Sequence, residues 1–99
     1  MSDDDKPVRL PIGDAIDLHA FRPRDVRSVV ESYLEEAAAA GLTEVRVIHG
    51  RGIGVQREAV RSVLARLPQV AGFADAPPER GGWGATIVHL RPLADRRGD

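Results

Sequence analysis

Two histidines and one aspartate stand where acid–base chemistry could take place in this chain. Asp17 and His19 stand two positions apart in the segment 16–21, "IDLHAF", and His49 ends the largely apolar segment 45–49, "VRVIH". Histidine exchanges a proton near neutral pH, so it suits general acid or base work, and a nearby carboxylate can orient its ring. Asp17, His19 and His49 are therefore the candidate catalytic residues.

The segment after His49 is rich in glycine and arginine. Its candidate phosphate-binding residues are Gly50, Arg51, Gly52, Gly54 and Arg57. Glycine permits positive φ and the close approach of a ligand, exposed loop amides and a following helix N-terminus attract phosphate, and arginine adds bidentate donors. The spacing matches neither the Walker loop nor the dinucleotide-binding fingerprint. A turn without a ligand stays open as the alternative.

Metal chemistry receives little support from the sequence. The chain has no cysteine, which excludes thiolate metal sites and disulfides. Asp17, His19 and His49 could instead ligate a divalent metal, but no carboxylate cluster or metal-ligand spacing is evident. No cofactor is predicted.

The strands and helices around these residues are predicted from hydrophobic periodicity and from the positions of glycine and proline. Strands are expected at 15–18, 44–49, 70–75 and 85–90, with helices between Pro23 and Gly41 and at 56–67. This β-α-β-α-β-β order predicts a four-stranded mixed sheet in a two-layer α/β sandwich, with both helices on one face. In this layout Trp83, in a glycine-rich loop, is expected to cap the core rather than stack on a base.

Strand ends should bring the candidate residues together. In parallel α/β arrangements ligands bind beyond the C-terminal ends of the strands, and His19 and His49 end the first two strands. Ile16 and Leu18 are expected to face the helices. Asp17 then faces the opposite way with His19, or its carboxylate turns to bind loop amides.

Length and composition are those of one globular domain. The chain has 99 residues, 42% hydrophobic and 29% charged, with a formal net charge of −1. This charge argues against a broadly basic surface, so any anion-binding patch must be local. No apolar run is long enough to cross a membrane, and a cytoplasmic location is expected. Residues 1–14 are interpreted as an acidic tail, 15–91 as the domain and 92–99 as a C-terminal tail.

Three segments together resemble the Smr (small MutS-related) domain in order and spacing. They are "IDLHAF" at 16–21, "VRVIHGRGIGVQR" at 45–57 and "GGWGATIVHL" at 81–90. The resemblance covers roughly residues 15–91 and implies a two-layer α/β sandwich. The sequence departs from the family pattern at Ala20, usually glycine, and at Gln56, usually leucine. Both departures lie at the edge of the expected site.

The resemblance also implies nucleic-acid binding and, in several members, endonuclease activity on DNA or RNA, including messenger RNA on stalled ribosomes. The leading hypothesis is therefore an endonuclease that cleaves RNA more readily than it nicks DNA, without a metal, and that could associate with ribosomes. His19 would act as acid or base, Asp17 as its orienter, and His49 as a second proton-transfer or phosphate group. The alternative is a non-catalytic module that binds structured nucleic acid or a protein.

Overall fold

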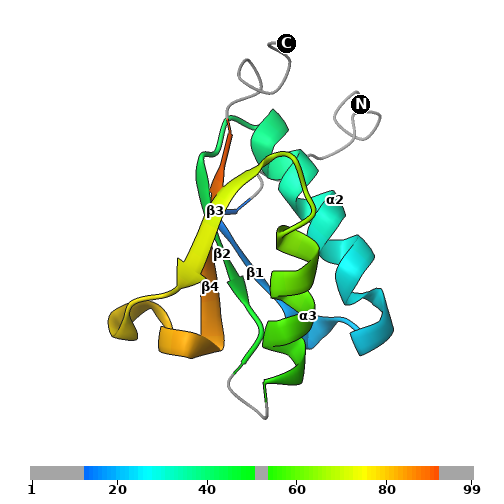
Figure 1. The fold of residues 1–99 in the computed structure, drawn as a ribbon, viewed down its shortest axis with the longest axis vertical. Coiled ribbons are helices and arrows are strands. Elements are labelled where there is room, and N and C mark those ends of the chain that lie inside the picture. The colour runs from blue at the N-terminus through cyan, green and yellow to red at the C-terminus, as the bar shows by residue number, and fades with distance from the viewer. Residues whose placement is uncertain (1–12, 51–53, 92–99) are drawn as a thin grey trace, which may run out of the picture.

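The protein is built on a four-stranded mixed sheet, seen in a computed structural model that describes residues 13–50 and 54–91. The strands are β1 (Ala15–Asp17), β2 (Glu44–Ile48), β3 (Val70–Asp75) and β4 (Ala85–Leu90). Their order across the sheet is β1-β2-β4-β3 (Figure 1). β1 and β2 are parallel, and β4 runs antiparallel to both β2 and β3.

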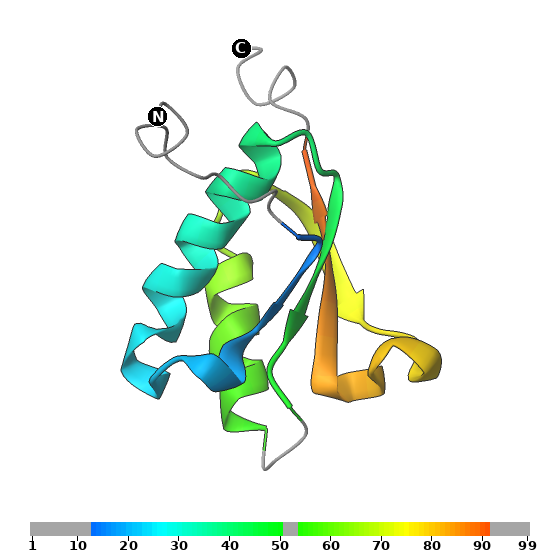
Figure 2. The same ribbon diagram turned by 180° about the vertical axis from the view of Figure 1, so that it is seen from behind.

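Both longer helices lie on one face of this sheet. They are α2 (Val26–Ala39), which connects β1 to β2, and α3 (Val55–Leu64), which connects β2 to β3 (Figures 1 and 2). The predicted two-layer α/β sandwich, with its β-α-β-α-β-β order and mixed sheet, is confirmed. α2 ends before Gly41, whose φ of +90° is the left-handed conformation expected at a helix C-terminus.

The main core fills the space between the sheet and the helices. In β2 and β4 alternate residues point toward the helices, which is the period of two expected for strands covered on one face. The completely or almost completely buried aliphatic residues of this core include Val30 and Leu34 from α2, Val60 and Leu64 from α3, and Val45, Val47 and Val88 from the sheet.

The opposite face of the sheet carries a second, smaller apolar cluster. Ala76, Ala85 and Ile87 are buried there, and Ile48 packs against them. The segment between β3 and β4 folds beside this face (Figure 2). Arg46 of β2 fixes it by donating from Nη1 to the carbonyl of Arg80, 3.0 Å away. This connection brings residues 82–84 back to the end of the sheet where β2 finishes.

The first strand is shorter than predicted. β1 ends at Asp17, and Leu18–Ala20 form one turn of 3-10 helix. A second 3-10 turn, Pro23–Asp25, precedes α2, so Pro23 occupies a first helical turn as expected. In the described part of the chain, no helix is long and apolar enough to cross a membrane. The predicted tails lie largely outside the described residues.

Candidate functional site

Asp17 and His19 form a close pair at the C-terminal end of β1. Oδ1 of Asp17 accepts hydrogen bonds from the His19 backbone amide at 2.9 Å and from its Nδ1 at 2.7 Å. The carboxylate thus caps the 3-10 turn and also orients the His19 ring. Of the two orientations expected for Asp17, the structure shows the one in which the carboxylate binds a backbone amide. The hydrogen bond from the backbone amide is the larger cause that lowers the pKa of Asp17, and the bond from the ring lowers this pKa further. Both side chains are exposed.

Gly50 lies directly beside the His19 ring. Its φ is +86°, and a Cβ at this position would come within 2.9 Å of Nε2 of His19. A side chain here would therefore be strained and would also push the ring away. The segments that follow β1 and β2 therefore meet at this contact, as expected for the ends of parallel strands. The nitrogen that faces Gly50 is Nε2, which is not the ring nitrogen bonded to Asp17.

His49 is placed differently from His19. His49 is only 5% exposed, and both of its ring nitrogens are hydrogen-bonded. Nδ1 lies 3.0 Å from the carbonyl oxygen of Gly50, and Nε2 lies 2.9 Å from Oγ1 of Thr86. Because a carbonyl only accepts, Nδ1 carries the proton, and a neutral ring accepts from the Thr86 hydroxyl. The predicted site thus contains one exposed histidine and one buried histidine.

The electrostatic surroundings of His49 favour the neutral ring. Burial is the largest cause that lowers its pKa, and the nearby positive charges of Arg57 and Arg61 lower it further, against the hydrogen bond to Gly50. A neutral, fully bonded imidazole suits a positioning role better than proton transfer. Thr86, which completes this arrangement, was not singled out from the sequence.

The N-terminus of α3 follows the glycine segment. Gly54 precedes the helix with a φ of +87° and makes no side-chain cap. The first amides of any helix lack partners within the helix, so this end can donate to an anion. Of the other predicted phosphate-binding residues, Arg51 and Gly52 lie outside the described residues.

Arg57 is held by an acidic partner. Its Nη2 donates to Oδ1 of Asp75 at 2.7 Å, and Arg61 donates to the same oxygen at 2.6 Å. The hydrogen bond from Arg57 is the largest cause that lowers the pKa of Asp75, and the bond from Arg61 lowers it further. The Arg57 side chain is only 23% exposed, and its guanidinium lies 5.7 Å from the centre of the Trp83 ring. Sequence reasoning found Arg57 but missed Arg61 and Asp75.

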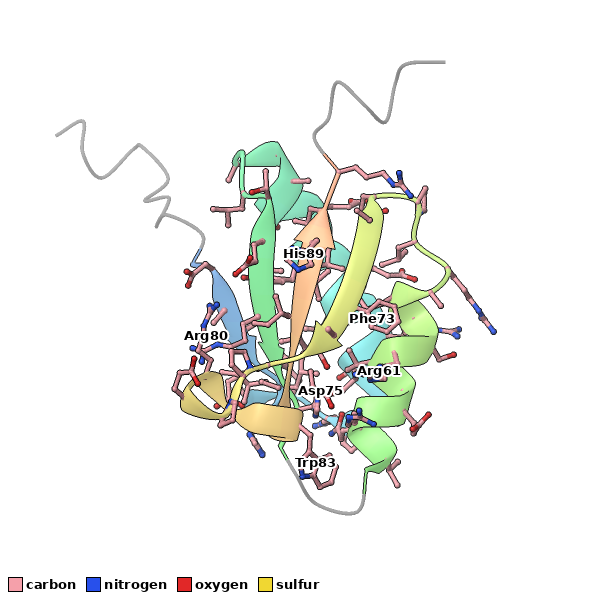
Figure 3. The ribbon with its side chains drawn as sticks, turned by 60° about the vertical axis from the view of Figure 1, so that its left-hand side comes forward. Arg61, Phe73, Asp75, Arg80, Trp83 and His89 are labelled. Carbon is pink, nitrogen blue, oxygen red and sulfur yellow. The ribbon has the colours of Figure 1, made fainter. Side chains whose placement is uncertain are left out.

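Trp83 does not take the role expected from the sequence. It is 42% exposed, so the prediction that it caps the core is wrong. It lies in the 3-10 turn Gly82–Gly84, at the end of the molecule where β4 begins (Figure 3). The glycines on either side let this turn project beyond the sheet, so the indole is presented to solvent beside Arg57.

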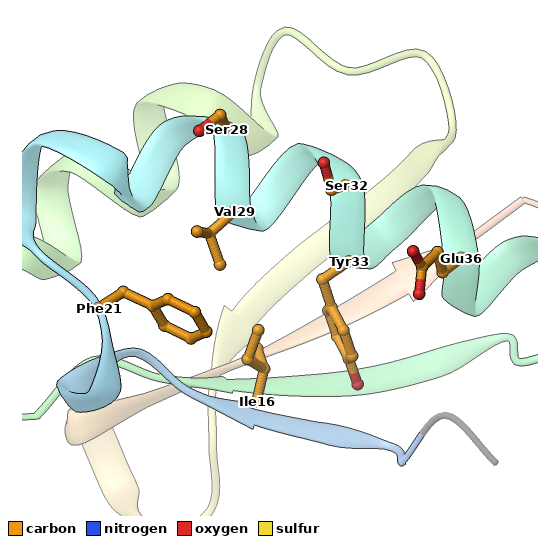
Figure 4. A pocket seen from close by; sticks show the side chains of 7 residues that line it. All are labelled: Ile16, Phe21, Ser28, Val29, Ser32, Tyr33 and Glu36. Atoms are coloured by element: carbon orange, nitrogen blue, oxygen red, sulfur yellow. The ribbon is translucent and has the colours of Figure 1, made fainter. Parts of the chain in front are cut away.

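As far as the structure describes it, the candidate site lies at an open edge of the molecule rather than in a cavity. A hollow of about 350 Å³ lies between β1 and α2 and is lined chiefly by Ile16, Phe21, Val29 and Tyr33 (Figure 4). None of the predicted site residues within 13–50 and 54–91 lines it. An open edge beside a helix N-terminus suits a polymeric ligand better than a small enclosed molecule.

Metal binding finds no ready ligand set within the ranges that the structure describes. No group of three or more histidine, aspartate or glutamate side chains lies there in a metal-binding arrangement. Asp17 and His19 use Oδ1 and Nδ1 on each other, and His49 uses both ring nitrogens. Both ring nitrogens of His49 are thus already bonded within the protein, and a metal on this ring would have to break one of these bonds.

The structure places both departures from the family pattern and accounts for the one at position 20. Ala20 ends the 3-10 turn that begins at Leu18, and among the described residues no residue other than glycine has positive φ. Position 20 therefore does not require glycine in this chain. Gln56 lies in the first turn of α3 and is half-buried.

Comparisons with known proteins identify similar chains. The family model described as the Smr domain matches residues 16–91. The endonuclease MutS2 of Thermus thermophilus is 46% identical over 77 residues, which are 78% of this chain and 10% of that protein. The chain therefore spans about a tenth of the length of this curated relative.

Two solved structures resemble the fold. The Smr domain of Thermus thermophilus MutS2 has a TM-score of 0.76 at 44% identity, covering 81% of this chain and 100% of that chain. The stand-alone small MutS-related protein YdaL of Escherichia coli has a TM-score of 0.74 at 31% identity, covering 79% of this chain and 64% of that one.

Proposed function

The chain belongs to the Smr domain family, and we propose that it binds nucleic acid and cleaves it as an endonuclease, with RNA preferred over DNA. The observation that carries this proposal is the Asp17–His19 pair, an exposed imidazole oriented through Nδ1 with Nε2 beside Gly50. An oriented proton acceptor next to a phosphate-binding surface would support cleavage of a phosphodiester, and the proposed acceptor on His19 adjoins Gly50, the first residue of the proposed phosphate-binding segment.

His19 acts as the general base in this proposal. Its Nε2 takes the proton of a ribose 2′-hydroxyl, the 2′-oxygen attacks the adjacent phosphorus, and the bond from phosphorus to the 5′-oxygen breaks. The leaving 5′-oxygen takes a proton from water. The products are a 2′,3′-cyclic phosphate and a 5′-hydroxyl. This route draws its nucleophile from the substrate and needs no metal, which is the reason for preferring RNA.

The other site residues hold the substrate or the site. The first amides of α3 and the glycine segment bind the phosphate, with Arg51 as a charged donor. Arg57 adds positive potential from its place beside Asp75. His49 positions Gly50 by donating to its carbonyl, and Thr86 fixes the opposite side of the His49 ring.

A non-catalytic binding module is the second candidate. The observation in its favour is His49, whose ring nitrogens are both occupied. His19 is then the exposed imidazole of the predicted site, and water has to supply the second proton transfer, to the leaving 5′-oxygen. A binding module would retain phosphate affinity without any product.

Incubation of the pure protein with labelled RNA and labelled DNA, each with and without a chelator, tests the proposal. We expect RNA fragments with cyclic phosphate ends, undiminished by the chelator, and a rate at least tenfold lower in His19→Ala. The matched control is His89→Ala, which removes an exposed imidazole at the other end of β4. Intact RNA with wild-type protein, but salt-sensitive binding, would favour the binding module.

A further inference from the structure

Trp83 is the only tryptophan of the chain, and the structure exposes it. An exposed indole loses the hydrophobic free energy that burial would give it. Nearby Phe73 packs against the main core and has Arg61 5.3 Å from its ring centre. Of these two aromatic residues on the same side of the molecule, one serves the core and the other faces solvent (Figure 3).

The backbone ties Trp83 to the candidate site. Gly84, its neighbour in sequence, accepts hydrogen bonds at its carbonyl from the amide of His49 at 3.1 Å and from the amide of Gly50 at 2.8 Å. The residue that carries the indole is thus bonded through one peptide to the glycine that contacts His19. Movement of one relative to the other is restricted by these two bonds.

Arg57 defines how the indole is presented. Its guanidinium lies over the ring at 5.7 Å from the centroid, and Asp75 holds that guanidinium in place. A cation against an aromatic ring is favourable and limits the rotamers of both side chains. The exposed aromatic surface is therefore ordered, lies beside positive charge, and adjoins the N-terminus of α3.

We propose that Trp83 is the platform on which an unpaired base of the nucleic acid stacks, one step from the phosphate bound at Gly50 and α3. This inference rests on the proposed function and specifies its substrate class as a strand with at least one unpaired base. Stacking on an aromatic ring accepts every base, since each has a π face, and the guanidinium of Arg57 favours the adjacent phosphate. A base paired and stacked in a duplex cannot reach the indole in this way.

The single tryptophan makes the test direct. Wild-type protein is titrated with a single-stranded oligonucleotide and with a blunt duplex of the same sequence, and binding is followed by anisotropy of a dye on the nucleic acid. Indole fluorescence is recorded in the same titration. We expect the single strand to quench the fluorescence of Trp83 along the binding curve, and the duplex to leave it unchanged.

Variants of Trp83 separate the effect of an aromatic face from that of apolar bulk. Trp83→Phe keeps an aromatic face and should bind the single strand within a few-fold of wild type. Trp83→Leu keeps an apolar side chain without a face and should lose about five- to a hundredfold in affinity. His89→Ala is the control for an exposed ring elsewhere and should bind as wild type. Circular dichroism melts confirm that each variant is folded.

The outcomes also distinguish this inference from the function on which it rests. Salt-sensitive binding with unchanged indole fluorescence and equal affinities for Trp83→Leu and wild type would overturn the platform and leave nucleic-acid binding intact. Absence of binding to any probe would overturn both. Equal losses in Trp83→Phe and Trp83→Leu would assign Trp83 to the shape of its turn and reject stacking.

Discussion

The imidazole of His19 lies against the main chain of Gly50, with Nε2 only 2.9 Å from where a Cβ of residue 50 would stand. Gly50, which follows β2, therefore lies directly against the imidazole that we propose as the general base. Gly54 gives a comparison within the same chain, because it has nearly the same φ, +87° against +86°, but a Cβ there would meet nothing within 4 Å.

Gly50→Ala and Gly54→Ala should therefore separate backbone strain from ring displacement. Each alanine is forced into a left-handed conformation, so each should cost about 1 kcal/mol and lower Tm by several degrees. Only Gly50→Ala displaces His19, and it should reduce RNA cleavage at least tenfold more than Gly54→Ala. Melting curves and cleavage rates of the two variants make the comparison. Equal cleavage by both would contradict the assigned contact.

The sequence predicted most of the fold, because periodicity and turn residues are local signals. It placed His19 and His49 at one edge but treated them alike. The difference lies in strand phase: His49 continues the odd-numbered, helix-facing positions of Val45 and Val47, which are buried. That phase could have predicted a buried His49, whereas its bond to Thr86 depends on the pairing of distant strands.

The surroundings of Arg57 could not be predicted in this way. Asp75 and Trp83 come from a strand end and a turn far along the chain, and only the β2-β4-β3 arrangement brings them to α3. The expectation that Trp83 caps the core was chosen because a single aromatic residue is weak evidence for nucleic-acid binding. It was wrong because the 82–84 turn carries the indole beyond the sheet edge.

Asp17→Asn should disturb the orientation of His19. The carboxylate accepts hydrogen bonds from both the amide and Nδ1 of His19, which holds the proton of a neutral ring on Nδ1 and leaves Nε2 without a proton, as the proposed general base requires. An amide in its place donates as well as accepts, so this preference weakens. Long-range proton–nitrogen spectra should show a shift toward the other tautomer, and cleavage should fall at least tenfold. An unchanged tautomer would remove the orienting role from Asp17.

Asp75→Asn should lower stability at neutral pH more than Glu58→Gln does. Both variants remove one negative charge near Arg57, but Asp75 bonds Arg57 and Arg61 at 2.7 and 2.6 Å, whereas Glu58 is 3.9 Å from Arg57. Because the pKa of Asp75 is lowered in the folded protein, its contribution is present above 3.8 and is lost as pH falls through the lowered pKa. The gap in Tm between wild type and Asp75→Asn should therefore narrow in acid. A gap independent of pH would argue against the ion pair.

His49 should make the fold sensitive to mild acid. Its pKa is lowered by burial, so below the ordinary value of 6.5 the unfolded chain binds a proton that the folded protein does not. Stability is then full above 6.5 and decreases as pH falls toward the lowered pKa, by at most about 1.4 kcal/mol per pH unit. Below the lowered pKa the folded protein is protonated too, and the decrease attributable to His49 stops.

His49→Asn tests this by removing the titrating ring while keeping an amide that can donate to Gly50. Its free energy of unfolding, measured with urea at several pH values from 7.5 to about 5, should be lower than that of wild type at pH 7.5. The loss of the Thr86 bond and of buried ring volume accounts for that difference. The dependence of this free energy on pH should be shallower than that of wild type. If the free energy of unfolding of His49→Asn depended on pH as steeply as that of wild type, His49 would not be a buried group with a lowered pKa.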